Sequence, residues 1–210
     1  MIQVMEPKKL KLAILASGRG SNFDAIYEAI ISNKLNAEIN ILISDKENAA
    51  ALDKARNRNI SAMHINPKNF ENREGYETEL VKQLEETNVD LVILAGYMRL
   101  VGHVLLEAYK HRMLNIHPAL LPSFPGLHAQ RQAVDYGVRF SGCTVHFVDE
   151  GMDTGPIILQ SAVPVLQDDD EDSLAERILV EEHNTYWRAI QLIADGKVYI
   201  DSRKVYIKEG

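Results

Sequence analysis

The segment Leu10-Lys11-Leu12-Ala13-Ile14-Leu15-Ala16-Ser17-Gly18-Arg19-Gly20-Ser21-Asn22 contains the most informative change of pattern in the chain. Its first part, up to Ala16, is almost continuously apolar, as in a strand buried on both faces of a sheet. Two glycines then mark a tight turn, and a helix is expected from about Ser21 to Asn33. A strand, a glycine turn and a helix in this order predict the start of an α/β fold.

The same alternation continues to about residue 110. We expect strands over 37–44, 60–65 and 89–95, and helices over 47–58 and 69–87. The strand at 89–95 is the most apolar and is predicted to lie centrally in the sheet. Strands that alternate with helices are joined by right-handed crossovers and run parallel. The pattern predicts an α/β fold: a Rossmann-like three-layer sandwich, with a mostly parallel central sheet and helices on both faces.

The regular alternation of strands and helices ends after residue 111. The expected elements there are strands over 113–116, 142–148 and 157–165, helices over 128–136 and 172–194, a proline-containing loop over 118–127 and a terminal hairpin over 197–207. No linker or low-complexity stretch divides the chain. We therefore expect a single domain over residues 1–210, with a mononucleotide-binding half at 10–110 and a second half at 111–210.

The composition is that of an ordinary water-soluble protein. Of the 210 residues, 46% are hydrophobic and 25% charged, and the net charge is −7. This charge argues against nucleic acid and anionic membranes as partners, and no apolar run is long enough for a signal peptide or a membrane span. Cys143 is the only cysteine, which fits a cytoplasmic location, and no His/Cys cluster has the spacing of a metal site. Small-molecule substrates are the expected partners.

The glycine turn is a candidate anion site. Gly18 and Gly20 let the backbone approach a ligand, and the helix that follows offers N–H groups and the positive end of its dipole. We expect a phosphate there, with Ser21 and Asn22 as further donors. The dinucleotide fingerprint is incomplete, because Phe23 stands where a small residue is required. A tight turn with only a structural role is the alternative.

Two other nucleotide-binding motifs are relevant to the same turn. A P-loop is excluded, because no Gly-Lys-Ser/Thr follows the glycines. Asp45 ends the second predicted strand, where dinucleotide-binding proteins carry the acid that binds the ribose. A non-catalytic module that binds a nucleotide or nicotinamide dinucleotide therefore stays open as an alternative function.

Asn115-Ile116-His117-Pro118 is the strongest candidate for chemistry. Residues two apart on an extended segment point to the same side, and Pro118 ends the strand. Asn115 and His117 are thus expected at the carboxyl end of a strand, where open α/β sheets bind ligands. An amide and an imidazole together can stabilise an oxyanion, and the imidazole can move a proton near neutral pH. A capping Asn and a surface His are the alternative.

An acidic loop follows the strand at 142–148. It runs from Asp149 to Pro156, and glycines and a proline give it a compact shape. One of its acids, if close to His117, would raise the pKa of that imidazole and fix its orientation. From this segment alone, a solvated acidic turn is the favoured interpretation. His146 is expected to be packed or hydrogen-bonded rather than a metal ligand.

The long helix predicted at 172–194 has a mainly structural interpretation. The acids at 168–172 suit a solvated helix N-terminus. Glu181-Glu182-His183 lie deeper in the helix, where one acid can reach a ligand, but a solvent-facing surface is the default interpretation. Tyr186 and Trp187 are expected to be packing residues.

Three motifs together resemble the folate-dependent formyltransferases. They are Gly18-Arg19-Gly20-Ser21-Asn22, then Asn115-Ile116-His117-Pro118 continued by Leu120-Leu121-Pro122, and Asp153-Thr154-Gly155-Pro156, in the family's order and spacing. The segment Pro122-Ser-Phe-Pro-Gly-Leu-His-Ala-Gln-Arg-Gln-Ala133 is similar to the phosphoribosylglycinamide formyltransferases within that family. The resemblance extends from about Lys11 to Gly196.

The resemblance implies a reaction and its machinery. A formyl group would pass from 10-formyltetrahydrofolate, a cosubstrate, to the amine of 5-phosphoribosylglycinamide in purine (IMP) biosynthesis, without a metal. Asn115, His117 and Asp153 match the catalytic trio, so the second half of the chain would be the catalytic and folate-binding half. Asn115 and His117 would stabilise the tetrahedral oxyanion, and Asp153 would raise the pKa of His117 and assist proton transfer.

The resemblance also implies binding residues. Gly20, Ser21 and Asn22 would hold the ribose phosphate, and Leu179, Val180, Glu181 and Glu182 would touch the glycinamide, with Glu182 the polar contact. The folate site would comprise Arg73, at the carboxylate tail, Met98, Arg99, Leu100, Val101, Asn115, Asp149, Glu150, Gly151, Met152 and Asp153. A monomer or a homodimer is expected.

Two other formyl-handling families are rival interpretations. The methionyl-tRNA formyltransferases share the trio but carry an RNA-binding domain, for which this chain has neither the length nor the positive charge. The formyltetrahydrofolate hydrolases use a similar trio with water as acceptor. They carry an additional N-terminal regulatory domain, and here the first strand already begins at about residue 10.

Overall fold

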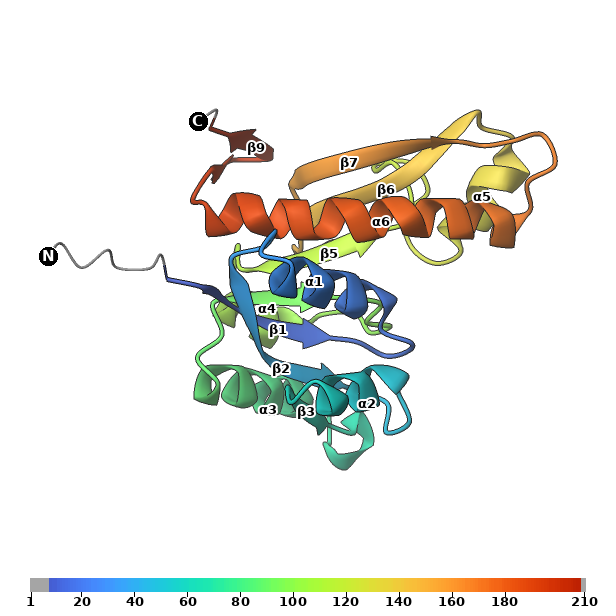
Figure 1. Cartoon of the computed structure of the whole chain (residues 1–210). Coiled ribbons are helices and arrows are strands. Elements are labelled where there is room, and N and C mark those ends of the chain that lie inside the picture. The colour runs from blue at the N-terminus through green and yellow to red at the C-terminus, as the bar shows by residue number, and fades with distance from the viewer. Residues whose placement is uncertain (1–7, 209–210) are drawn as a thin grey trace, which may run out of the picture.

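A computed structural model describes residues 8–208, and its core is one seven-stranded sheet flanked by helices (Figure 1). The strands are β1 Leu10–Leu15, β2 Ala37–Ser44, β3 Ser61–His64, β4 Leu91–Leu94, β5 Met113–His117, β6 Phe140–Phe147 and β7 Ile157–Pro164. The helices are α1 Ser21–Ile31, α2 Ala50–Asn57, α3 Arg73–Glu86, α4 His103–Ala108, α5 Ala129–Tyr136 and α6 Glu171–Ala194, with a 3-10 turn at Pro67–Asn69.

The strand order is β3-β2-β1-β4-β5-β6-β7, which places β4 in the centre as predicted. The first five strands in this order, β3, β2, β1, β4 and β5, pair in parallel. The last two, β6 and β7, are antiparallel to their neighbours. The direction of the crossovers reverses between β1 and β4. In such sheets the carboxyl ends of the strands beside this switch point form the ligand-binding crevice.

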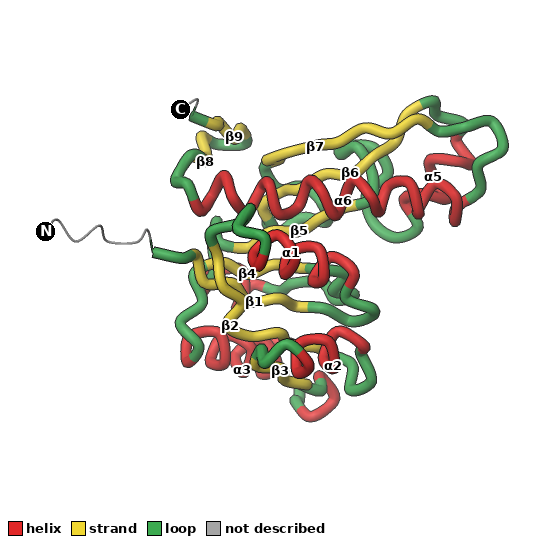
Figure 2. The backbone as a smooth tube through the Cα atoms, in the orientation of Figure 1, coloured by secondary structure: helices red, strands yellow, loops and turns green. Residues whose placement is uncertain are grey.

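Helices cover both faces of the sheet and form two cores. Strand residues such as Leu12 and Ile14 pack with α1, α2 and α6 on one face. Their neighbours Ala13 and Leu15 pack with α3 and α4 on the other face. The predicted α/β sandwich with a mostly parallel sheet is therefore confirmed. The loops after β1, β4 and β5 leave the same edge of the sheet, on the right in Figure 2.

Helix α4 was not predicted, because its sequence carries no local start signal. Its N-cap is Gly102, which has no side chain with which to cap. The buried carboxylate of Glu77, on α3, substitutes for one: it accepts hydrogen bonds from Gly102 N at 2.5 Å and Leu105 N at 3.3 Å. A start signal that lies 25 residues away cannot be recognised from local pattern.

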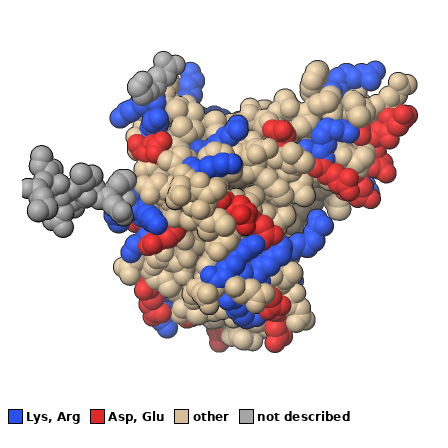
Figure 3. All heavy atoms as spheres, viewed as in Figure 1, with Lys and Arg blue, Asp and Glu red and all other residues tan. Residues whose placement is uncertain are grey.

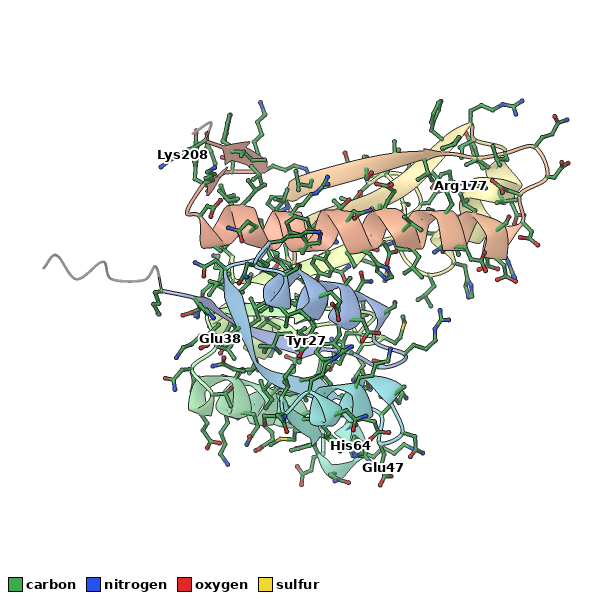
Figure 4. All side chains as sticks on the ribbon, viewed as in Figure 1. Tyr27, Glu38, Glu47, His64, Arg177 and Lys208 are labelled. Atoms are coloured by element: carbon green, nitrogen blue, oxygen red, sulfur yellow. The ribbon has the colours of Figure 1, made fainter. Side chains whose placement is uncertain are left out.

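Helix α6 runs alongside β6 and β7 and packs against α1, and so connects the two halves of the chain (Figure 1). Tyr186, which is almost fully buried, donates its hydroxyl to the carbonyls of Leu94 and Leu114, at 2.9 and 3.0 Å, at β4 and β5. Near the start of the helix, Arg177 forms a bidentate ion pair with Asp169 (Arg177 is labelled in Figure 4). This pair holds the pKa of Asp169 well below its usual range.

The predicted terminal hairpin is confirmed as β8 Val198–Asp201 and β9 Lys204–Ile207, with Tyr199 stacked on Tyr206. Figure 3 shows basic and acidic side chains side by side over α1 and α2, where Asp24 binds Lys54 and Arg58. Within residues 8–208, no helix is long and apolar enough to cross a membrane.

Candidate active site

The glycine turn lies between β1 and α1 in a conformation that needs glycine. Gly20 has φ 73°, and a Cβ there would lie 2.8 Å from the Cβ of Ala51. Gly20 is also the N-cap of α1, so the first N–H groups of the helix receive no side-chain cap. Ser21 is already helical, so it does not act as the N-cap that a purely structural turn would use. Uncapped helix N–H groups beside a glycine turn suit an anion.

Asn22, in the first turn of α1, reaches across to α6. Its side-chain amide donates to Glu182 Oε2 at 2.9 Å, and its own Oδ1 is buried without a hydrogen-bond partner. Glu182 is also buried, so the default interpretation of a solvent-facing residue is wrong. Burial raises the pKa of the Glu182 carboxyl, although the bond from Asn22 partly offsets this. A buried acid and an unpaired amide oxygen form a site for a hydrogen-bond donor.

The other residues of 179–182 lie in different surroundings. Glu181 accepts a hydrogen bond from Ser161 on β7 at 2.5 Å, and Val180 is exposed. Leu179 is partly buried. Of this segment, Glu182 is the residue that the structure brings to the glycine turn.

Asn115 and His117 lie on the same side of β5, as their spacing predicted, and Asp153 comes to them from the loop between β6 and β7. Asp153 Oδ2 is 3.3 Å from His117 Nδ1. On the second ring nitrogen, His117 Nε2 is 2.8 Å from the carbonyl oxygen of Phe124. The two ring nitrogens of His117 therefore face a carboxylate on one side and a backbone carbonyl on the other. The expectation of a solvated acidic turn is therefore wrong for Asp153.

Asp153 is held in place by its loop. It adopts φ 56°, a left-handed conformation that Asp tolerates better than most residues, and its Oδ2 also accepts from Gly126 N at 2.8 Å. Asp149, at the start of the loop, accepts from Gly151 N and from Thr154 Oγ1. Glu150 and Met152 are exposed. Within 149–153, Asp153 is the acid that faces the imidazole.

His146 is a member of this cluster whose role was underestimated from the sequence. It was expected to be packed or hydrogen-bonded, and it is: its Nδ1 donates to the Phe147 carbonyl at 2.8 Å. Its Nε2 lies 3.3 Å from Asn115 Nδ2 and 3.8 Å from Asp153 Oδ1. Burial lowers the pKa of His146, so its neutral form can accept a hydrogen bond from Asn115. The signal was the cross-strand pairing of His146 with Asn115, which is visible only once the register is known.

The proline-containing loop after β5 is anchored from the two antiparallel strands. Thr144, fully buried on β6, donates to Ala119 O at 2.7 Å and accepts from Leu121 N at 3.0 Å. Gln160, on β7, donates to both Thr144 Oγ1 and Leu121 O. These contacts place the backbone groups of Phe124 and Gly126 against the trio. The sequence offered no pattern that singled out Thr144 or Gln160.

The segment Met98–Val101 follows the central strand β4, beside the glycine turn. Its two ends are fixed: Met98 N donates to Ser17 Oγ at 2.9 Å, and the next residue, Gly102, donates to Glu77. Arg73 begins α3 and is exposed, and its stem packs so closely on Gly102 that a Cβ there would lie 2.7 Å from Arg73 Cδ. The structure thus brings Arg73 to the segment with which the resemblance grouped it.

Two hydrogen-bonded tyrosines, the buried Tyr76 and the partly buried Tyr97, lie next to this segment. The hydroxyls of Tyr76 and Tyr97 are 2.8 Å apart, and Arg99 lies over the Tyr76 ring at 5.3 Å. Burial raises the pKa of both tyrosines, so they remain neutral hydrogen-bonding groups. On the open side, the apolar side chains of Met98, Leu100, Leu127 and Met152 are more than half exposed. Exposed apolar side chains around a polar cluster are typical of a ligand site.

Two further expectations concern dinucleotides and metals. Asp45 is 6% exposed and accepts a hydrogen bond from Ser17 Oγ at 2.6 Å, so it does not present its carboxylate to a ribose. The dinucleotide module loses its remaining support. In the part of the chain that the structure describes, no group of three or more His, Cys, Asp or Glu side chains is placed to hold a metal ion.

Comparisons with known proteins agree with this geometry. Residues 10–190 match the family described as "Formyl transferase". The phosphoribosylglycinamide formyltransferase of Bacillus subtilis is 44% identical over 84% of this chain and 90% of its own length, and that of Escherichia coli is 37% identical over 94% and 93%. The chain also matches the trifunctional purine biosynthetic protein adenosine-3 of Drosophila melanogaster at 42% identity, but spans only 15% of its length.

Solved structures give the same result. A glycinamide ribonucleotide transformylase from Symbiobacterium toebii superposes with a TM-score of 0.97 at 44% identity, covering 100% of this chain and 99% of that one. A formyltetrahydrofolate deformylase from Pseudomonas syringae has a TM-score of 0.88 at 26% identity and covers 96% of this chain, which spans 66% of that protein. The chain therefore belongs to the formyl transferase family, and within it to the phosphoribosylglycinamide formyltransferases.

Proposed function

We propose that this protein transfers a formyl group from 10-formyltetrahydrofolate to the amine of 5-phosphoribosylglycinamide. The observation that carries the proposal is the approach of Asp153 Oδ2 to within 3.3 Å of His117 Nδ1, on the strand face that also carries Asn115. Two side chains of one strand and an acid from a distant loop thus meet at the edge of the sheet from which the glycine turn after β1 also leaves. The acidic chain with a single cysteine fits a cytoplasmic enzyme, as a monomer or a homodimer.

The trio supplies the chemistry that acyl transfer to an amine requires. Attack of the amine on the formyl carbon places negative charge on the formyl oxygen. The Asn115 amide has two N–H groups, and the contact with His146 leaves one of them for that oxygen. A protonated His117 would stabilise that oxygen through its positive charge, since Asp153 Oδ2 and Phe124 O already face its two ring nitrogens, and the Asp153 carboxylate balances this charge. Asp153 is also placed to assist the transfer of a proton from the attacking nitrogen to the leaving one.

We assign the ribonucleotide to the side of the glycine turn. Gly20, Ser21 and Asn22 would hold its phosphate at the N-terminus of α1. Glu182, from the segment Leu179–Glu182, would accept from the glycinamide amine, with the unpaired Asn22 Oδ1 beside it. These contacts would place the amine at the edge of the sheet near β5.

We assign the folate to the side of β4 and the loop after β6. Met98–Val101 would line the pocket together with Asp149–Asp153, and the exposed apolar side chains of both segments suit a flat heteroaromatic ring. Arg73, exposed beside this segment, would bind the carboxylate tail. The folate would act as a cosubstrate, and no step assigned here uses a metal.

Hydrolysis of the same folate is a second candidate, because the deformylase fold matches with a TM-score of 0.88. Steady-state measurements distinguish the two. The purified protein is mixed with 10-formyltetrahydrofolate, with and without 5-phosphoribosylglycinamide, and release of tetrahydrofolate is followed. Release that requires the ribonucleotide and yields its formylated form supports transfer. Equal release without the ribonucleotide would contradict our proposal and favour hydrolysis.

A further inference from the structure

The two loops to which we assign the substrates meet at one hydroxyl group. Ser17 lies between β1 and the glycine turn. Its backbone N–H donates to Gly96 O at 3.0 Å, and its Oγ accepts from Met98 N at 2.9 Å. The same Oγ donates to Asp45 Oδ1 at 2.6 Å. Because β2, β1 and β4 are neighbours in the sheet, Ser17 joins three adjacent strand ends.

Asp45 fixes the direction of these bonds. Its side chain is 2% exposed, and the nearest cation, Lys46 Nζ, is 3.9 Å from the other carboxylate oxygen. A buried carboxylate needs hydrogen-bond donors, and a hydroxyl has only one proton to give. The Ser17 proton therefore goes to Asp45, and a lone pair of Oγ remains for the Met98 N–H. A charge-assisted bond of this kind is short and directional, as observed.

Ser17 is covalently continuous with the phosphate turn and hydrogen-bonded to the folate segment. On one side, Gly18–Asn22 follows it directly in the chain. On the other, Met98 is the first residue of Met98–Val101. A ligand that orders the glycine turn therefore restrains Met98 through this hydroxyl, whereas the backbone N–H of Ser17 reaches only Gly96, before the folate segment. Within residues 8–208, the hydrogen bonds of this side chain reach Asp45 and Met98 and none of the trio, so we expect its influence on the reaction to pass through the loops.

We propose that Ser17, oriented by Asp45, is a positioning residue that couples the two substrate sites, so that occupation of one site raises the affinity of the other. The inference rests on the proposed function, because it needs the ribonucleotide at the glycine turn and the folate at 98–101. Coupling between binding sites is reciprocal, so either ligand can report it. For a link made by one hydroxyl we expect an affinity change of roughly three- to tenfold.

Calorimetry in a complex that cannot react tests the proposal. The dissociation constant of 5-phosphoribosylglycinamide is measured with and without saturating tetrahydrofolate, which lacks the formyl group. Their ratio is the coupling factor. The variants are Ser17→Ala, which removes the hydroxyl, and Asp45→Asn, which keeps an acceptor oxygen but not the charge. Ser44→Ala is the matched control, since Ser44 is also buried at this edge, but its Oγ accepts only from Lys46 N, two residues along the same strand end.

We expect a coupling factor of several-fold in the wild type, near one in Ser17→Ala, intermediate in Asp45→Asn and unchanged in Ser44→Ala. Each ligand alone should bind Ser17→Ala within about threefold of the wild-type affinity. Any of three results would overturn the inference: a wild-type coupling factor in Ser17→Ala, a loss of coupling in Ser44→Ala as large as that in Ser17→Ala, or no coupling in the wild type. If Ser17→Ala does not fold, the test rests on Asp45→Asn: a wild-type coupling factor in that variant would overturn the inference.

The outcome also separates this inference from the function on which it rests. If both ligands bind the wild type without affecting each other, the coupling is refuted and the proposed function stands. If neither ligand binds the wild type, the proposed function falls and the coupling falls with it.

Discussion

At the scale of single residues, the site depends on how completely His117 is surrounded. A carboxylate faces one ring nitrogen and a backbone carbonyl faces the other, and the ring itself is 4% exposed. Such a ring cannot rotate without losing both partners. Asn115 is held in turn by the neutral His146. The Asn115 N–H group and the His117 ring, which would stabilise the developing oxyanion by a hydrogen bond and by charge, are thus preorganised, and preorganised groups contribute most to this kind of catalysis.

Removing either donor should therefore reduce turnover strongly. We expect Asn115→Ala and His117→Ala to lower kcat about a hundred- to a thousandfold, the usual effect of losing one oxyanion donor. The dissociation constant of 5-phosphoribosylglycinamide, measured by calorimetry, should change much less. Asn184→Ala is the control, since that exposed amide bonds only to Val180 O on the same helix. A tenfold or smaller loss of kcat in both variants would contradict the assigned roles.

Asp153→Asn separates the charge of this residue from its shape. The amide can still accept from Gly126 N, so the loop should keep its conformation. The cationic His117 of the proposed mechanism loses its counterion, and we expect kcat to fall by at least tenfold with the KM for folate altered less. Steady-state kinetics at saturating ribonucleotide measure both constants. Wild-type kcat in this variant would show that the contact with His117 is not used in the reaction.

The sequence predicted these residues unequally. Asn115 and His117 could be placed together from strand alternation alone, because two residues apart on a strand means one face. Asp153 is 36 positions beyond His117, and only the resemblance linked the two. His146, Thr144 and Gln160 depend on the register between β5, β6 and β7, which local pattern does not contain. Their contributions became visible when the strands were paired.

At the scale of elements, the support of α4 from α3 has a measurable consequence. Glu77→Ala leaves the N–H groups of Gly102 and Leu105 without their acceptor, and we expect the free energy of unfolding to fall by about 1–3 kcal/mol. Glu77→Gln keeps one acceptor oxygen and should lose less. Urea denaturation measures both, with the exposed Glu74→Gln as control. Equal stability of all three variants would show that the cap contributes nothing.

Tyr186 tests how α6 is joined to the centre of the sheet. Tyr186→Phe keeps the ring in its buried position and removes only the bonds to Leu94 O and Leu114 O. We expect the free energy of unfolding to fall by about 1 kcal/mol, the usual net contribution of a buried hydrogen bond. Thermal or urea denaturation gives the value. The control Tyr136→Phe alters a tyrosine that is 80% exposed, and a loss of equal size there would contradict the argument.

The sequence predicted those helices and strands best whose formation depends on nearby residues. Helices α1, α3 and α6 and the apolar strands were found within a few residues of their observed bounds, because propensity and periodicity determine them. Helix α4 was missed because its cap comes from another helix. The antiparallel pairing of β6 and β7 was also not foreseen, since periodicity shows that a strand exists but not which way it runs.

At the scale of the whole molecule, acid should destabilise the fold in two stages. Burial lowers the pKa of His146, and the ion pair with Arg177 lowers that of Asp169. Both groups bind a proton more readily in the unfolded chain than in the folded protein, so the free energy of unfolding falls as the pH falls. The loss due to His146 begins near the unfolded value of about 6.5, and that due to Asp169 near about 3.9. Glu182, whose pKa is raised by burial, acts in the opposite sense between these limits.

The share of His146 in the first stage can be measured with one substitution, because His183, whose pKa burial also lowers, is unchanged in the variant. Wild type should lose unfolding free energy between about pH 7.5 and about pH 5.5, with a slope of at most about 1.4 kcal/mol per pH unit for each proton taken up only by the unfolded chain. His146→Gln removes that proton and should lose less over the same interval, even if it is less stable at every pH. Urea denaturation at several pH values measures the slopes, and His103→Gln, at a side chain that is 62% exposed, is the control. If His146→Gln and wild type show the same slope, the imidazole of His146 takes up its proton equally in the folded and unfolded states. Its assigned role as the neutral acceptor beside Asn115 would then be wrong.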